Sequence, residues 1–83
     1  MLLLQAIKEY LKDNYPDWHM IPSQLHHNTY TIHRDIDTNY LTTIYIKTTP
    51  QHIAHSTQVG WDTYTENTVL TQITQLINKN QPL

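Results

Sequence analysis

Two β-prone segments, residues 30–36 and 40–48, place the strongest constraint on the fold because each carries a set of apolar residues at even-numbered positions. They are Tyr30, Ile32 and Ile36 in the first segment and Tyr40, Ile44 and Ile46 in the second. This spacing gives each segment one apolar face in an extended conformation. The two faces share one side of a hairpin in only one register, since a shift of one residue would bury threonine hydroxyls. The pairs in this register are Tyr30 with Ile46, Ile32 with Ile44 and Ile36 with Tyr40.

The same register leaves residues 37–39, Asp-Thr-Asn, as a three-residue loop. Loops of this length typically contain a type I turn followed by a left-handed residue, a conformation that asparagine tolerates well. Residues 40–48 are almost entirely Ile, Tyr and Thr, so we predict that this second arm is a central strand of the sheet.

An amphipathic helix is expected at each end of the chain. Apolar residues recur at spacings of three and four over residues 2–14, and Pro16 ends that pattern. A second helix is predicted from Tyr64 to Lys79, behind a capping box formed by residues 63–66. The apolar stripe of this second helix consists of Val69, Leu70, Ile73, Leu76 and Ile77.

The segments between these elements have weaker patterns. Trp18 is expected to cap the core, and residues 19–24, which include Pro22, are expected to be a connector. The first hairpin strand is then expected to begin near Leu25 and to alternate cleanly from Thr29 onward.

Residues 51–59 are open to two interpretations. Alternating Ile53, His55, Thr57 and Val59 favour a third strand at the edge of the sheet, whereas proline after Thr49 is also typical of a short helix. We favour the strand because a sheet of three strands makes a more stable platform.

We therefore predict one small α+β domain over residues 1–83, with two layers in the order α-β-β-β-α. Both helices would cover one face of a three-stranded antiparallel sheet. The opposite face would be exposed and would carry Thr29, Thr31, His33, Thr43, Tyr45 and Lys47.

Composition excludes several classes of function. The chain has 83 residues, a formal net charge of −2, no cysteine and a single glycine, Gly60. Glycine-rich phosphate loops and cysteine-based chemistry are therefore excluded, and scattered basic residues disfavour binding to nucleic acid. No apolar run approaches the length of a signal peptide core or of a membrane span, so we expect a soluble protein without membrane contact, with the cytoplasm as its default location.

Histidine is the one enriched residue type that carries chemistry, with six copies in the chain. A helical His52-x-x-His55 pair could join His26 or His27 at a zinc ion, but in a strand the pair would point to opposite faces. A catalytic triad would need a strained turn for its nucleophile, which no glycine here supplies. We expect no metal, no cofactor and no catalytic residue.

In its order of elements the chain resembles double-stranded-RNA-binding domains and the small toxin nucleases of the HicA family. The nucleases carry a catalytic histidine next to the first strand, roughly where His26 and His27 stand. The glycine and serine before that histidine are replaced by Gln24 and Leu25. The resemblance implies an RNA-binding or RNA-cleaving domain, which we keep as the alternative function.

The favoured function is a non-catalytic module that binds a protein partner, or a second copy of itself, through the exposed sheet face or a sheet edge. Exposed aromatic residues, the types that dominate interface hot spots, support this interpretation. Small inhibitor proteins of phages and mobile elements often have this size and lack catalytic motifs. The candidate binding residues are Thr31, His33, Thr43, Tyr45, Lys47, His52, His55 and Trp61.

Overall fold

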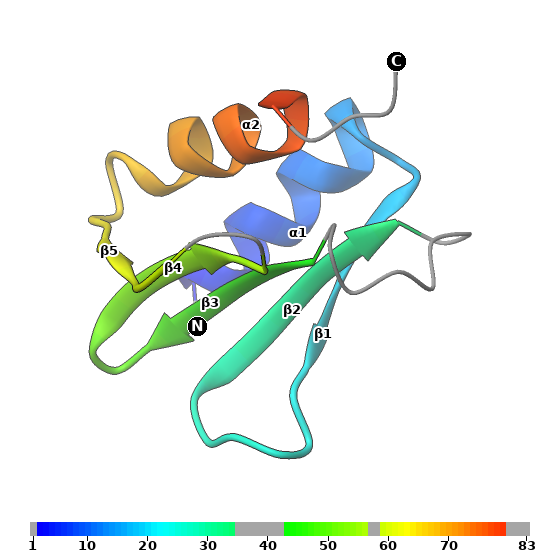
Figure 1. Cartoon of the computed structure of the whole chain (residues 1–83). Helices are drawn as coiled ribbons and strands as arrows, with labels where there is room; N and C mark the ends of the chain where they lie inside the picture. Colours follow the sequence, from blue (N-terminus) through cyan, green and yellow to red (C-terminus); the bar gives the residue numbers. More distant parts are fainter. Residues whose placement is uncertain (1, 35–42, 57–58, 80–83) are drawn as a thin grey trace.

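The computed structural model describes residues 2–34, 43–56 and 59–79. The described residues contain two helices and five strands, and the strands form one antiparallel sheet in the order β1-β2-β3-β4-β5 (Figure 1). The predicted α+β class and the two helices are confirmed, but the predicted count of three strands is wrong. The elements are α1 (Leu2–Asn14), β1 (Trp18–Pro22), β2 (Thr29–Arg34), β3 (Ile44–Thr48), β4 (Gln51–His55), β5 (Asp62–Thr63) and α2 (Val69–Lys79).

The central pair of strands, β2 and β3, has the register that the alternation predicts. Tyr30 lies opposite Ile46 and Ile32 opposite Ile44, so the apolar stripes of both strands share one face. The predicted pairing of Ile36 with Tyr40 and the loop at residues 37–39 lie outside the described residues.

Residues 51–55 form a strand, β4, and not a short helix. This strand pairs with β3 across the two-residue turn Thr49-Pro50, whose peptide bond is cis, and Ile53 lies opposite Ile46. The prediction that residues 51–59 form the edge of the sheet is wrong, because β5 pairs with the start of β4. A strand of two residues is too short to produce a readable alternation in the sequence.

The sequence predicts a connector at residues 19–24, and this prediction is wrong for the first four of them. They belong to β1, an edge strand in which Trp18 lies opposite Arg34 and Met20 opposite Ile32. Pro22 ends the strand, as expected of proline at a sheet edge. Trp18 is only 4% exposed, which confirms that it caps the core.

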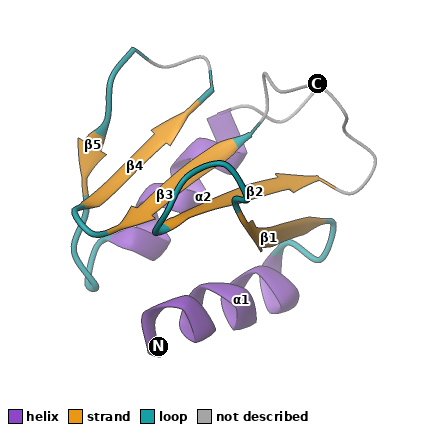
Figure 2. Cartoon of the chain, turned by 90° about the horizontal axis from the view of Figure 1, so that it is seen from below, coloured by secondary structure: helices purple, strands orange, loops and turns teal. Residues whose placement is uncertain are grey.

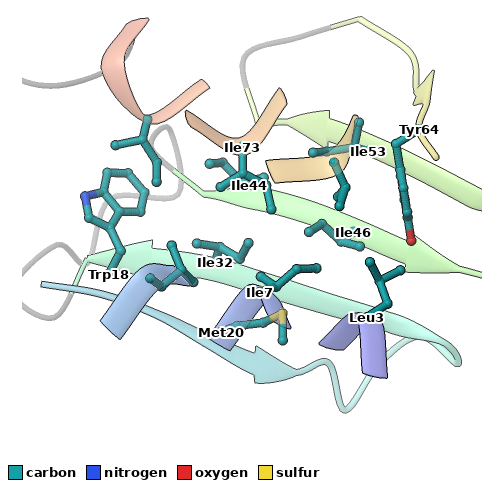
Figure 3. Packing of buried hydrophobic residues seen from close by; sticks show 13 residues of the cluster. Leu3, Ile7, Trp18, Met20, Ile32, Ile44, Ile46, Ile53, Tyr64 and Ile73 are labelled. Atoms are coloured by element: carbon teal, nitrogen blue, oxygen red, sulfur yellow. The ribbon is translucent and has the colours of Figure 1, made fainter. Parts of the chain in front are cut away.

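Both helices contribute to one hydrophobic core against the same face of the sheet (Figures 1 and 3). Two hydrogen bonds join the helices directly, one between the hydroxyls of Tyr10 and Thr74 and one from the Tyr15 hydroxyl to Asn78 Oδ1 (3.3 Å). Among the described residues, neither helix is long and apolar enough to cross a membrane. The core consists of Leu3, Ile7, Leu11, Trp18, Met20, Ile32, Ile44, Ile46, Ile53, Tyr64, Val69, Ile73 and Ile77.

Helix α2 begins later than the predicted residue 64, and threonines form its start. Thr65 O accepts hydrogen bonds from the amides of Thr68 (3.1 Å) and Val69 (3.0 Å). Thr68 Oγ1 accepts a hydrogen bond from the Thr65 amide at 2.9 Å. Thr68 thus takes the place that Glu or Gln usually fills in a capping box, two residues beyond the predicted box.

Replacing Ile73 by Asp should unfold the domain. Ile73 is fully buried in the middle of α2, so the variant would lose apolar burial and place a carboxylate in the core. We expect a loss of more than about 3 kcal/mol in the free energy of unfolding. Urea denaturation followed by circular dichroism measures it, with Gln75→Asp on the exposed side of α2 as the control. A cooperative transition near that of the wild type would contradict the packing of α2 on the sheet.

Replacing Thr68 by Ala should cost about 1 kcal/mol of stability, because the Thr65 amide loses its side-chain acceptor. Thr71→Ala, on an exposed position of the same helix, keeps the cap and serves as the matched control. Equal melting temperatures for the two variants would show that Thr68 does not cap the helix.

Candidate functional site

The face of the sheet turned away from the core, here called the outer sheet face, carries mostly polar and aromatic side chains, together with Ile21 and Ala54, in cross-strand rows. Seen from below, the sheet lies in front of α2, while α1 lies beside β1 (Figure 2). Because side chains alternate along a strand, each residue beside a core residue belongs to this outer face. One row runs across four strands and consists of Ile21, Thr31, Tyr45 and Ala54.

A second row ends in a cluster of three side chains, Lys47, His52 and Trp61. Lys47 lies opposite His52, which in turn lies opposite Thr63 in β5. Lys47 Nζ lies 4.6 Å from the centroid of the Trp61 ring, a cation–π distance. The centroids of the His52 and Trp61 rings lie 6.3 Å apart. We call these three residues the Trp61 cluster.

The segment after Trp61 is fixed by several hydrogen bonds although β5 has only two residues. The Tyr64 amide donates to Gln51 O at 3.3 Å, and the Tyr64 hydroxyl donates to Lys47 O at 2.7 Å. Gln72 Nε2, from α2, donates to Thr63 O at 3.0 Å. Burial of Tyr64 raises the pKa of its phenol, which therefore stays protonated as a donor. The backbone beside Trp61 is thus tied to both the sheet and a helix.

The structure brings several of the predicted binding residues together and separates others. Thr31 and Tyr45 are cross-strand neighbours on the outer sheet face, next to the row that holds Lys47 and His52. His33 lies in another row, opposite His19 of β1. Thr43 precedes β3, is only 7% exposed, and offers little surface to a partner.

His55 differs from the other predicted binding residues because it lies on the core face. It is opposite Ile44 and only 3% exposed, so we leave it out of the candidate surface. Burial lowers the pKa of its imidazole, and the positive charge of Lys79 on α2 lowers it further. His52 and His55 therefore point to opposite faces, and the zinc pair that a helix would create is not formed.

His26 and His27 lie in the loop between β1 and β2, where both are exposed. This loop contains a left-handed residue, Asn28, with φ of 56°, and the Ser23 hydroxyl accepts hydrogen bonds from two backbone amides in it. The loop lies at the opposite end of β2 from His33. Within the described ranges, no group of three His, Asp or Glu side chains has an arrangement that could hold a metal ion.

Two residues of the outer sheet face, His19 and Ile21, are not among the predicted binding residues, because the sequence pattern predicts a connector at residues 19–24. Ile21 is 49% exposed, which is unusual for a strand residue of its size. The alternation of Trp18 with Met20 was the signal for this strand. This alternation is hard to recognise because Ile21 is apolar where a polar residue would be expected, and Pro22 follows it directly.

The chemistry available on the outer sheet face suits binding. The Trp61 cluster presents an aromatic surface beside a cation, and the neighbouring threonine and tyrosine hydroxyls can donate and accept hydrogen bonds. Comparison of the chain with protein-family models, with curated proteins and with solved structures gives no match.

The lowered pKa of His55 should make the fold less stable in mild acid. The unfolded chain binds a proton at the ordinary value of about 6.5, whereas the folded chain resists protonation at this position. Above that pH neither state is protonated there and stability is unaffected. As the pH falls below about 6.5, protonation of the unfolded chain lowers the free energy of unfolding. This loss stops once the pH is below the pKa of His55 in the folded chain.

Urea denaturation at pH 7.5, 6.5 and 5.5 tests this prediction, with values chosen to bracket the ordinary histidine pKa of about 6.5. We expect the decline in stability between the extremes to be smaller in His55→Gln than in the wild type. The matched control, His26→Gln, changes an exposed histidine and should keep the wild-type decline. An equal decline in all three proteins would contradict the role of His55.

Proposed function

We propose that the chain is a non-catalytic interaction module that binds a protein partner through the outer sheet face. The observation that carries this proposal is the Trp61 cluster. Trp61 is 42% exposed, and its ring lies against Lys47 while the backbone around it is tied to β4 and α2. A large aromatic side chain on a fixed backbone loses little conformational freedom when a partner covers it.

The residues around the cluster fit the anatomy of a protein interface. Aromatic residues concentrate binding energy, and polar residues at their rim exclude water and fix orientation. Tyr45 and Thr31 lie next to the cluster, and Ile21 continues the same face toward β1. The experiment below distinguishes a different protein from a second copy of the chain as the partner.

Replacing Trp61 by Ala should weaken partner binding by at least about tenfold, which corresponds to the loss of a hot-spot residue. Tagged wild type, Trp61→Ala and the control Gln75→Ala would be used for affinity capture from cell extract. The captured protein would then be titrated against each variant by calorimetry. Gln75 is exposed on α2, away from the outer sheet face, so its replacement should not alter affinity.

Sedimentation of the purified wild type at several concentrations identifies the case of self-association. A dimer that Trp61→Ala dissociates and Gln75→Ala leaves intact would make the partner a second copy. If the wild type stays monomeric and Trp61→Ala binds every captured protein as tightly as the wild type does, the proposal is wrong. RNA cleavage that depends on His26 or His27 would support the alternative function instead.

A further inference from the structure

A second surface lies at the other end of the sheet, where α1 and β1 border an open groove. The groove has a volume of about 610 Å³ and is lined by residues from both elements. Trp18 and Met20 belong to the core face of β1, whereas His19 and Ile21 belong to its outer face, and all four line the groove. Because the groove is lined by residues from both faces of β1, it runs along the edge of β1 that is not paired with β2.

The backbone of β1 has hydrogen-bonding groups on this open side. The Ser23 amide donates to Thr29 O at 2.9 Å, so the odd-numbered residues at this end of the β1–β2 ladder bond to β2. The alternation turns the amide and carbonyl of Met20 away from β2. The Trp18 amide donates to Tyr15 O, and Pro22 has no amide proton, so Met20 is the residue of β1 that can offer both groups to a new strand.

The charge of the groove selects among possible occupants. Lys8 and Lys12 line it from α1, and none of the described residues that line it is acidic. The two lysines are four positions apart and share one side of the helix. Glu9 and Asp13 each follow a lysine by one position, which turns them about 100° away around the helix axis. The described residues that line the groove therefore carry a net positive charge from Lys8 and Lys12.

We propose that this groove binds an extended, acidic segment of a partner protein, which adds to β1 as a further antiparallel or parallel strand. Its main chain would pair with Met20, its acidic side chains would face Lys8 and Lys12, and its apolar side chains would cover Ile21. Addition of a strand to a sheet edge is a common mode of peptide recognition, with backbone bonds giving affinity and side chains giving specificity.

A second copy of the chain is the less suitable occupant. Two β1 strands paired about a two-fold axis would bring Lys8 and Lys12 of each copy to the same seam, where like charges repel. Acidic side chains remove this repulsion and add attraction. The groove and the Trp61 cluster lie at opposite ends of the sheet, so the two surfaces can be tested separately.

The first test measures binding of a labelled peptide of alternating Glu and Val by fluorescence polarisation. We expect binding that weakens with added salt, and no binding of the matched peptide of alternating Lys and Val. Lys8→Glu and Lys12→Glu should each weaken binding about fivefold, and the double variant should weaken it about twentyfold or more. The matched control Lys79→Glu, at the exposed end of α2, and Trp61→Ala should leave the affinity unchanged.

The second test asks whether the peptide binds as a strand. Hydrogen exchange of the Met20 amide, measured by NMR, should slow at least about tenfold when the Glu-Val peptide is bound. Two methylated peptides separate the possibilities, one with N-methyl groups on its Glu amides and one with N-methyl groups on its Val amides. Only one of these two sets of amides faces β1 in a bound strand, so one peptide should lose binding and the other should keep it. Equal binding of both methylated peptides, or unchanged exchange at Met20, would overturn strand addition.

Two further results would overturn the proposal as a whole. One is equal affinity of the wild type and the Lys8→Glu/Lys12→Glu double variant for the Glu-Val peptide, with melting temperatures showing that both are folded. The other is a dimer in sedimentation that Ile21→Glu dissociates and that competes with the peptide, which would assign the groove to a second copy. Loss of partner binding in Trp61→Ala alone bears on the outer sheet face and leaves this proposal intact.

Discussion

The structure depends on one set of apolar contacts, the isoleucines at the centre of the sheet. Ile32, Ile44, Ile46 and Ile53 come from three neighbouring strands, and none of them is more than 1% exposed. They lie between the sheet and both helices (Figure 3). Because alternate residues of a strand point to opposite faces, burying this set also determines which residues are left on the outer sheet face. The positions of Tyr45, Lys47 and His52 thus follow from packing on the other side.

The parts of the fold that could be predicted from the sequence are those with a long hydrophobic pattern. The β2–β3 register followed from several alternating positions in each arm, and α1 followed from its apolar spacing and from Pro16. The pattern failed at the two ends of the sheet. In β1, the apolar side chain of Ile21 is exposed at a position where alternation predicts a polar residue. Strand β5 is too short to show alternation. The five-stranded sheet therefore looked like a three-stranded one.

The candidate site could be predicted only in part for the same reason. The face that each residue of β2 and β3 occupies could be predicted from the register, but the burial of Thr29 (4% exposed) could not. The proximity of Trp61 to Lys47 depends on β5, whose position is set by hydrogen bonds from Tyr64 and Gln72 and not by any local pattern. The burial of His55 could not be predicted, because the face that it occupies depends on the register of β4, where the hydrophobic pattern is ambiguous. Contacts between residues distant in sequence decide such cases.

The two edges of the sheet are protected in different ways against pairing with a further strand. The two proposed surfaces lie at these two ends and therefore differ in how they can bind a partner. At one end, β5 has two residues and so offers a new strand little to pair with. At the other end, β1 is longer, but Pro22 and the bond from the Trp18 amide leave few free backbone groups. A strand added there can gain few main-chain hydrogen bonds, so most of its selectivity must come from side chains. The lysines of α1 are the charged groups placed to supply it.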